Sequence, residues 1–161
     1  MFSHDNLCDA AVAFAKRSGF GVVFGDRFRA CTTTGEQPDC LAFRSGVSLL
    51  IECKTSRSDF LADRKKNFRK DPSLGMGSWR FMLTPKGLLK IEELPEKWGL
   101  LEITPAGRIM KTHGWPTNTS WISNKPFEAN LVAENMYMYS ALRRMEIRGH
   151  LKEVYEGMPD A

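Results

Sequence analysis

Three charged side chains stand at the ends of two apolar segments, and their types and spacing suit metal-assisted chemistry. Asp39 precedes an apolar run at 40–43, while Glu52 and Lys54 close a second run at 48–53. Because side chains alternate along a strand, Glu52 and Lys54 share one face. Two carboxylates beside a lysine make a hard oxygen site for a divalent cation, with a fixed positive charge next to it.

A tight-turn sequence separates the two apolar runs. The residues Arg-Ser-Gly at 44–46 predict that the runs fold back on each other as a β-hairpin. Asp39 could then meet Glu52 and Lys54 from the neighbouring strand.

The order of these residues resembles a known nuclease motif. Pro38-Asp39 followed by Glu52-Cys53-Lys54 is similar to the motif of the PD-(D/E)xK nuclease superfamily. The next segment resembles its counterpart in the MmcB-like DNA repair family, a branch that includes phage relatives. In that family the motif lysine precedes Ser-Arg-x-Asp-Phe and then Asp-Arg-Lys, which stand here at 56–60 and 63–65. The likeness covers roughly residues 36–112.

This resemblance implies a metal-dependent deoxyribonuclease that acts in DNA repair, recombination or phage DNA metabolism. Asp39, Glu52 and the backbone carbonyl of Cys53 would hold Mg²⁺ or Mn²⁺, which lowers the pKa of a bound water and polarises the phosphate. Lys54 would orient or deprotonate that water, or stabilise the transition state electrostatically. The candidate catalytic residues are therefore Asp39, Glu52 and Lys54.

Three other interpretations of the same chain stay open. Glu52 and Lys54 could form an ordinary ion pair on an edge strand, which would be worth little. A nuclease-like fold could be catalytically silent and bind nucleic acid or a protein partner, because fold does not fix function. The methionine-rich segment near the C-terminus could be a protein-interaction helix. The complete triad favours catalysis, because a decayed site is expected to lose the lysine or one carboxylate.

Length and composition fit a single domain over 1–161. A chain of 161 residues can bury a core without cross-links, and 23 basic against 19 acidic residues permit a DNA partner without requiring one. We expect a cytoplasmic protein without membrane contact, because the N-terminal segment does not resemble a signal peptide and no apolar run reaches membrane-spanning length. The four cysteines form no C-x-x-C pair. We therefore expect free thiols rather than structural zinc, with Cys40 and Cys53 buried.

The elements before the hairpin offer further acidic candidates. Apolar residues three and four apart predict a helix over 5–17, and a β-branched and aromatic run predicts a strand over 20–28. The resemblance implies that such an opening helix can lend an acidic ligand, for which Asp5 and Asp9 are candidates. Glu36 in the following loop is another. Residues of this kind are more often non-catalytic: Asp5 and Asp9 would complement the helix dipole and aid solubility, and Glu36 would be a solvated loop carboxylate.

A basic helix is predicted directly after the triad. Ser58 suits its N-cap, and apolar residues lie on one face up to about residue 69. The remaining surface is strongly positive, and next to a metal site it indicates a wall that binds phosphates, although such a run is often only solvated. The candidate nucleic-acid-binding residues are Arg57, Arg64, Lys65, Lys66, Arg69 and Lys70.

The remaining elements complete an α/β prediction. A buried strand is expected at 79–84, a short helix at 87–94, a strand pair around 105–107 and a helix within 126–155 whose methionines fill a core or a homodimer seam. The ending at 156–161 is expected to be disordered. The order of elements, together with the resemblance, predicts a restriction-endonuclease-like αβββαβ core over about 5–112, a mixed central sheet flanked by helices, and an extra C-terminal helix.

Overall fold

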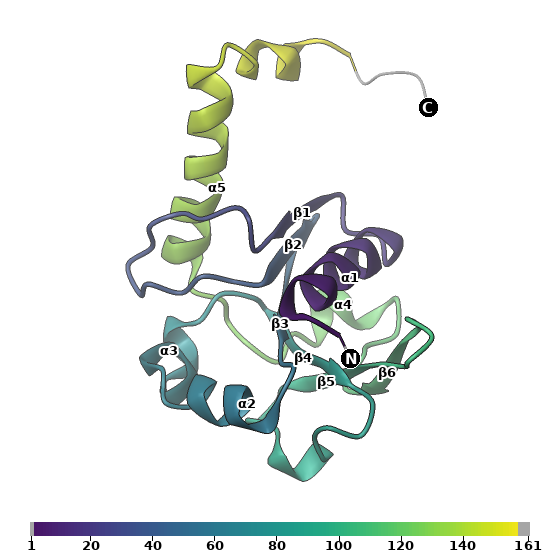
Figure 1. Cartoon of the computed structure of the whole chain (residues 1–161). Coiled ribbons are helices and arrows are strands. Elements are labelled where there is room, and N and C mark those ends of the chain that lie inside the picture. The colour runs from purple at the N-terminus through teal and green to yellow at the C-terminus, as the bar shows by residue number, and fades with distance from the viewer. Residues whose placement is uncertain (1, 158–161) are drawn as a thin grey trace.

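A mixed sheet runs through the middle of the protein, with helices against both of its faces (Figure 1). This computed structural model describes residues 2–157. The strands lie side by side in chain order; antiparallel pairing joins β1 to β2, β2 to β3 and β5 to β6, whereas β3, β4 and β5 run parallel. The six strands are β1 (Val22–Gly25), β2 (Cys40–Arg44), β3 (Val47–Cys53), β4 (Trp79–Pro85), β5 (Gly99–Ile103) and β6 (Ile109–His113).

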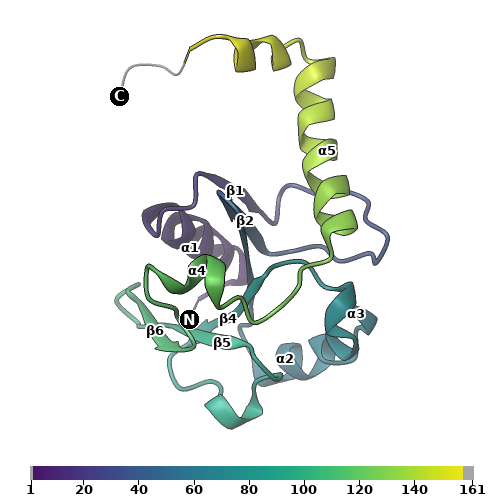
Figure 2. The ribbon, with the colours of Figure 1, turned by 180° about the vertical axis from the view of Figure 1, so that it is seen from behind.

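The helices divide between the two faces of this sheet. Figures 1 and 2 show α1 (His4–Arg17) and α4 (Ser120–Ser123) on one face and α2 (Arg57–Asp63) and α3 (Asn67–Lys70) on the other. Helix α5 (Leu131–Ile147) starts at the body and extends away from it. Single 3-10 turns stand at η1 (Pro72–Leu74), η2 (Ile91–Glu93) and η3 (Leu151–Tyr155). The predicted α/β class is therefore confirmed.

Helix α1 forms where the periodicity predicts it. Its apolar stripe, including Leu7, Ala11 and Phe14, is buried against the sheet. Ser3 caps the N-terminus by accepting a hydrogen bond from the backbone of Asn6. Gly19 follows the helix with φ of +90°, a conformation that glycine adopts without steric cost.

The predicted hairpin is confirmed, and it places alternate residues of β3 on opposite faces. Gly46 takes a positive φ in the turn, and Cys40 pairs with Ile51 across the two strands. Leu49, Ile51 and Cys53 pack in the core beneath α1, whereas Leu50 packs in the core on the other face. All seven residues of β3 are buried, because helices and loops cover both sides of this central strand.

Several predicted boundaries differ from the structure. The strand expected at 20–28 is only β1, the helix expected at 87–94 is the single turn η2, and the long C-terminal helix is α5 followed by η3. The disorder expected for the last residues falls mainly on 158–161, which lie outside the described residues.

The single basic helix expected to run to about residue 69 is instead two short helices. Lys66 takes an extended conformation between α2 and α3. In a continuous helix, Asp63 and Arg69 would be about 120° apart around the axis, at 100° per residue. The break allows Arg69 to turn back, and its Nε donates to Asp63 Oδ2 over 2.7 Å.

The loop after α3 is fixed by a buried arginine from β4. Arg80 is 1% exposed and donates hydrogen bonds to the backbone carbonyls of Pro72, Gly75 and Gly77. Its guanidinium also lies 4.0 Å from the centre of the Phe127 ring. Burial lowers the pKa of Arg80 to about 10, so the side chain remains charged at neutral pH. The loop is thereby held against the sheet beside the candidate site.

We expect Gly77→Ala to destabilise this loop strongly. Gly77 has φ of +87°, and a Cβ there would lie 2.7 Å from the Cβ of Leu50. Strain and overpacking together should reduce the free energy of unfolding by about 2–4 kcal/mol, measured by urea denaturation. Gly87→Ala is the matched control, because Gly87 also has a positive φ but a methyl group added there would meet nothing within 4 Å. Equal losses in the two variants would contradict the packing argument.

Helix α5 is joined to the body through Tyr137 and, near its C-terminal end, through Arg144. Tyr137 is fully buried, and its hydroxyl donates to the carbonyl of Phe28 over 3.1 Å, while Arg144 donates to the carbonyl of Arg29. Several large apolar side chains of α5 are exposed: Leu131, Val132, Met138, Tyr139, Leu142, Met145 and Ile147. Within residues 2–157, no helix combines the length and the apolar character that crossing a membrane requires.

Candidate functional site

Asp39 lies at the start of β2, next to the end of β3. The pairing of Cys40 with Ile51 brings positions 39 and 52 opposite each other if it continues by one residue. Asp39 Oδ2 accepts a hydrogen bond from the backbone N–H of Cys53 over 2.8 Å. The carboxylate is therefore held at the end of the strand that carries the Glu-x-Lys triplet.

Glu52 and Lys54 lie together on the face covered by α2 and α3. Lys54 Nζ is 3.4 Å from Glu52 Oε2 and 3.5 Å from Asp63 Oδ1, and all three side chains are at least 96% buried. The sequence had not marked Asp63 as a site residue. It belongs to the Asp-Arg-Lys segment on which the family resemblance partly rests, and that segment was the only signal that could have identified it.

Arg69 joins the carboxylates of this face into one network. Its guanidinium lies 2.6 Å from Glu36 Oε1, 2.7 Å from Asp63 Oδ2 and 3.0 Å from Glu52 Oε1. The contact with Glu52 is close but is not aligned as a hydrogen bond, because Arg69 Nη2 and Glu52 Oε1 both lack a hydrogen-bond partner. Only 2% of the Arg69 side chain is exposed, so as folded it does not reach a phosphate backbone outside the protein.

Glu36 is an internal member of the same network. The residue is 0% exposed, and its Oε2 accepts from the backbone N–H of Met76 over 2.7 Å. Burial raises the pKa of this carboxyl, and the charge of Arg69 opposes the increase. Glu36 thus connects the site to the loop that Arg80 fixes, rather than standing as a solvated loop carboxylate.

The charges of the network set the protonation state of Lys54. Burial alone would lower the pKa of Lys54, but the carboxylates of Glu52 and Asp63 outweigh burial and raise it. For the acid Asp63, burial acts to raise the pKa, but the positive charges of Arg69 and Lys54 outweigh burial and lower this pKa to about 2. Lys54 is therefore an ammonium at neutral pH, which favours electrostatic stabilisation over proton abstraction among its candidate roles.

The pKa of Asp39 is shifted upward, in contrast to that of Asp63. Burial and the nearby charge of Glu52 raise the pKa of Asp39 to about 6. A carboxyl whose pKa is higher in the folded protein than its usual 3.8 contributes stability that is complete below about pH 3.8 and is lost as pH rises through about 6.

The Asp39→Asn variant should reveal this dependence. Between about pH 4 and pH 6.5 the wild-type protein should lose up to about 3 kcal/mol of unfolding free energy relative to the variant, since each pKa unit corresponds to about 1.36 kcal/mol. Urea denaturation of both proteins at several pH values measures the difference. Parallel stability curves would show that Asp39 titrates near its ordinary value.

Helix α1 brings a histidine, not an aspartate, to Asp39. His4 Nε2 lies 3.4 Å from Asp39 Oδ1. The candidates Asp5 and Asp9 are both exposed, and Asp9 instead lies 3.8 Å from Arg27. Sequence reasoning missed His4, and no local pattern distinguishes it from other polar residues at a helix start.

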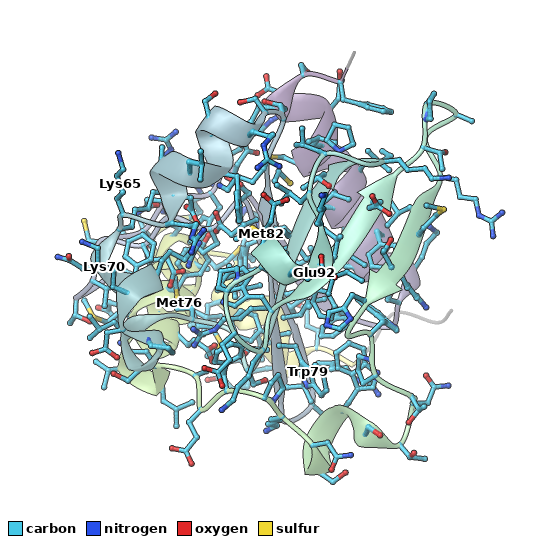
Figure 3. The ribbon with its side chains drawn as sticks, turned by 90° about the horizontal axis from the view of Figure 1, so that it is seen from below. Lys65, Lys70, Met76, Trp79, Met82 and Glu92 are labelled. Atoms are coloured by element: carbon cyan, nitrogen blue, oxygen red, sulfur yellow. The ribbon has the colours of Figure 1, made fainter. Side chains whose placement is uncertain are left out.

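Of the six basic candidates after the triad, the Arg69 side chain is buried and the other five are exposed, two of them in ion pairs with carboxylates. Arg64, Lys65 and Lys70 are exposed, and Figure 3 shows Lys65 and Lys70 extending outward from the α2 and α3 segment. Lys66 Nζ lies 2.8 Å from Asp63 Oδ1, and Arg57 forms an ion pair with Glu93. Arg64, Lys65, Lys66 and Lys70 therefore present positive charge at the surface of this segment, although the charge of Lys66 is partly neutralised by Asp63.

Potential metal ligands gather on the α1 side of Asp39. Among residues 2–157, two groups of three donor atoms lie within 4.8 Å of one another: His4 with Cys8 and Asp26, and Cys8 with Asp39 and Cys53. Neither group contains Glu52, whose carboxylate faces Lys54 and Arg69. Asp39 and Glu52 thus stand at neighbouring strand ends but are turned toward different partners.

Comparison with known proteins informs the fold alone. No family model and no curated protein matches the chain. A solved structure, that of the SPO1766 protein of unknown function from Silicibacter pomeroyi, is similar to this chain with a TM-score of 0.58 and 20% sequence identity over 92% of each chain. Two chains can share a fold at this level of identity without sharing a function.

Proposed function

We propose that this protein is a metal-dependent nuclease of the PD-(D/E)xK type that hydrolyses DNA phosphodiester bonds, built on a restriction-endonuclease-like core. The observation that carries the proposal is the placement of Glu52 and Lys54 at the end of a buried central strand, with Asp39 hydrogen-bonded to the intervening Cys53 amide. The order of one helix, three strands, helical segment and strand supports the same core.

The donors present fit a hard divalent cation such as Mg²⁺ or Mn²⁺. Asp39, Glu52 and the Cys53 carbonyl offer oxygen ligands. The buried Glu52 Oε1 accepts no hydrogen bond, but it lies 3.0 Å from Arg69 Nη2, so an ion would approach this oxygen beside the guanidinium. When bound, the ion would activate a water molecule and polarise the scissile phosphate. Lys54, held as an ammonium by Glu52 and Asp63, would stabilise the negative charge that develops on the phosphoryl oxygens.

The exposed cations would hold the DNA backbone beside this site. Arg64, Lys65 and Lys70 are free of carboxylate partners within 4 Å among the described residues and lie in the segment that covers the network. Their contacts would go to phosphates and would therefore give affinity without sequence preference.

A second candidate function is DNA binding without cleavage. Arg69 supports it, because a buried guanidinium already neutralises the carboxylates of Glu36, Glu52 and Asp63. A cation that uses Glu52 would have to share this carboxylate with Arg69.

A cleavage assay separates the two functions. The purified protein is incubated with branched, single-stranded and duplex DNA in the presence of Mg²⁺, Mn²⁺ or a chelator. The nuclease proposal predicts cleavage with either cation and none with the chelator. Salt-sensitive DNA retention without cleavage under any metal would support the binding-only function and overturn the nuclease proposal.

A further inference from the structure

Soft metal ligands converge on the face of the sheet opposite Glu52 and Lys54. Helix α1 presents His4 and Cys8 one turn apart, and Cys53 points toward the same helix from β3. His4 Nε2 lies 3.3 Å from Cys8 Sγ and 3.4 Å from Asp39 Oδ1. Cys8 Sγ, an Asp39 oxygen and Cys53 Sγ lie within 4.8 Å of one another.

These distances suit a small tetrahedral site. With metal–nitrogen, metal–oxygen and metal–sulfur bonds of roughly 2.0–2.3 Å, the ligand atoms of a tetrahedral zinc site lie roughly 3.3–3.8 Å apart. The His4 contacts to Cys8 and Asp39 already fall in this range. The cysteine pair needs an approach of at most about 1 Å. His4 must also move closer to the Cys8, Asp39 and Cys53 group, because the four donor atoms do not all lie within 4.8 Å of one another.

The surroundings allow an ion to reach the donors. Cys8 and Cys53 are at most 1% exposed, whereas the side chains of His4 and Asp39 are 43% and 14% exposed. One side of the cluster is therefore open to solvent, and the thiols line its interior. Two thiolates, one carboxylate and one imidazole form a donor set that borderline transition metals prefer over Mg²⁺.

We propose that His4, Cys8, Asp39 and Cys53 form a binding site for a borderline transition metal ion of the Zn²⁺ class. The site does not depend on nuclease activity. It shares Asp39 with the proposed Mg²⁺ site, so an ion bound here withdraws one ligand from that site. The spacing of the cysteines along the chain argued against zinc, but α1 and β3 bring two of them together.

Cobalt titration of the reduced full-length chain tests the site. Co²⁺ is expected to bind with one ion per chain and to produce thiolate-to-cobalt charge-transfer absorption, and Zn²⁺ should displace it. Cys8→Ser should remove most of that absorption. Cys31→Ser is the matched control, because Cys31 is exposed and lies outside the cluster; its spectrum should equal that of the wild-type protein.

His4→Gln is a second variant for the case in which Cys8→Ser, a substitution in the core, impairs folding. His4 is partly exposed at the start of α1, so the variant should fold, as checked by circular dichroism. Its affinity for Co²⁺ should fall by more than about 100-fold, since even residues that only orient a metal ligand contribute 10–100-fold. Absence of thiolate absorption in the wild-type protein, or unchanged affinity in His4→Gln, would overturn the proposal. Neither result depends on DNA cleavage, so failure of the nuclease assay is a separate outcome.

Discussion

Lys54→Met is expected to reduce metal-dependent DNA cleavage by about 10²–10³-fold, the cost of removing one preorganised charge from a reaction centre. Methionine preserves most of the apolar stem but removes the ammonium that lies between Glu52 and Asp63. The Lys54 ammonium is buried and is proposed to stabilise charge that develops only in the transition state. The loss should therefore appear mainly in the rate of the cleavage step rather than in DNA affinity. Single-turnover cleavage under saturating Mg²⁺ measures it.

Lys65→Met is the matched control for this experiment. Lys65 is an exposed member of the same basic segment, so the substitution removes the same charge outside the network. It should weaken DNA binding modestly and in a salt-dependent manner, with little change in kcat. Cleavage by Lys54→Met at the wild-type rate, in protein shown to be folded, would remove Lys54 from the catalytic site.

Arg69→Met is expected to lower the free energy of unfolding at neutral pH by about 3–5 kcal/mol. The guanidinium contacts three buried carboxylates, those of Glu36, Glu52 and Asp63. Removing one partner from a buried ion pair leaves the other charges without compensation, which costs about this much. Equilibrium denaturation in urea at pH 7 measures the change.

The pH dependence of the unfolding free energy of Arg69→Met should show whether uncompensated buried carboxylates cause the loss of stability. Burial already raises the pKa of Glu36, and without the opposing charge of Arg69 this pKa should rise further above its unfolded value, so the variant gains stability as pH falls from 7 toward 5. In the wild-type protein, Asp63 has its pKa lowered to about 2 and contributes stability above its usual 3.8 that is lost only as pH falls through about 2. The difference in unfolding free energy between the wild-type protein and Arg69→Met should therefore become smaller under mildly acidic conditions.

Two comparisons complete this experiment. Arg64→Met removes an exposed guanidinium and should change stability by no more than about 0.5 kcal/mol. Added Mg²⁺ should stabilise Arg69→Met more than the wild-type protein if a divalent ion can use the freed carboxylates. A loss below about 1 kcal/mol, independent of pH, would show that Arg69 is a surface residue in solution.

The first helix and the hairpin of this protein could be predicted from sequence because their signals are local. The apolar stripe of α1 repeats within neighbouring turns, and Gly46 marks the turn between β2 and β3 within a few residues. The same local rule places Glu52 and Lys54 on one face of a strand and Cys53 on the other. Predicted boundaries failed where tertiary contacts decided them, as at the break that returns Arg69 to Asp63.

The candidate site itself was only partly determined by the sequence. Arg64 and Arg69 belong to one basic run and are chemically identical, yet one is exposed and the other is enclosed by carboxylates, including Glu36 at a separation of 33 residues. Asp63, His4 and Cys8 likewise acquire their roles from partners on other elements. Local periodicity shows which way a side chain leaves its own helix or strand. Whether a charge is solvated or buried depends on which distant groups pack over it, and only the tertiary structure decides that.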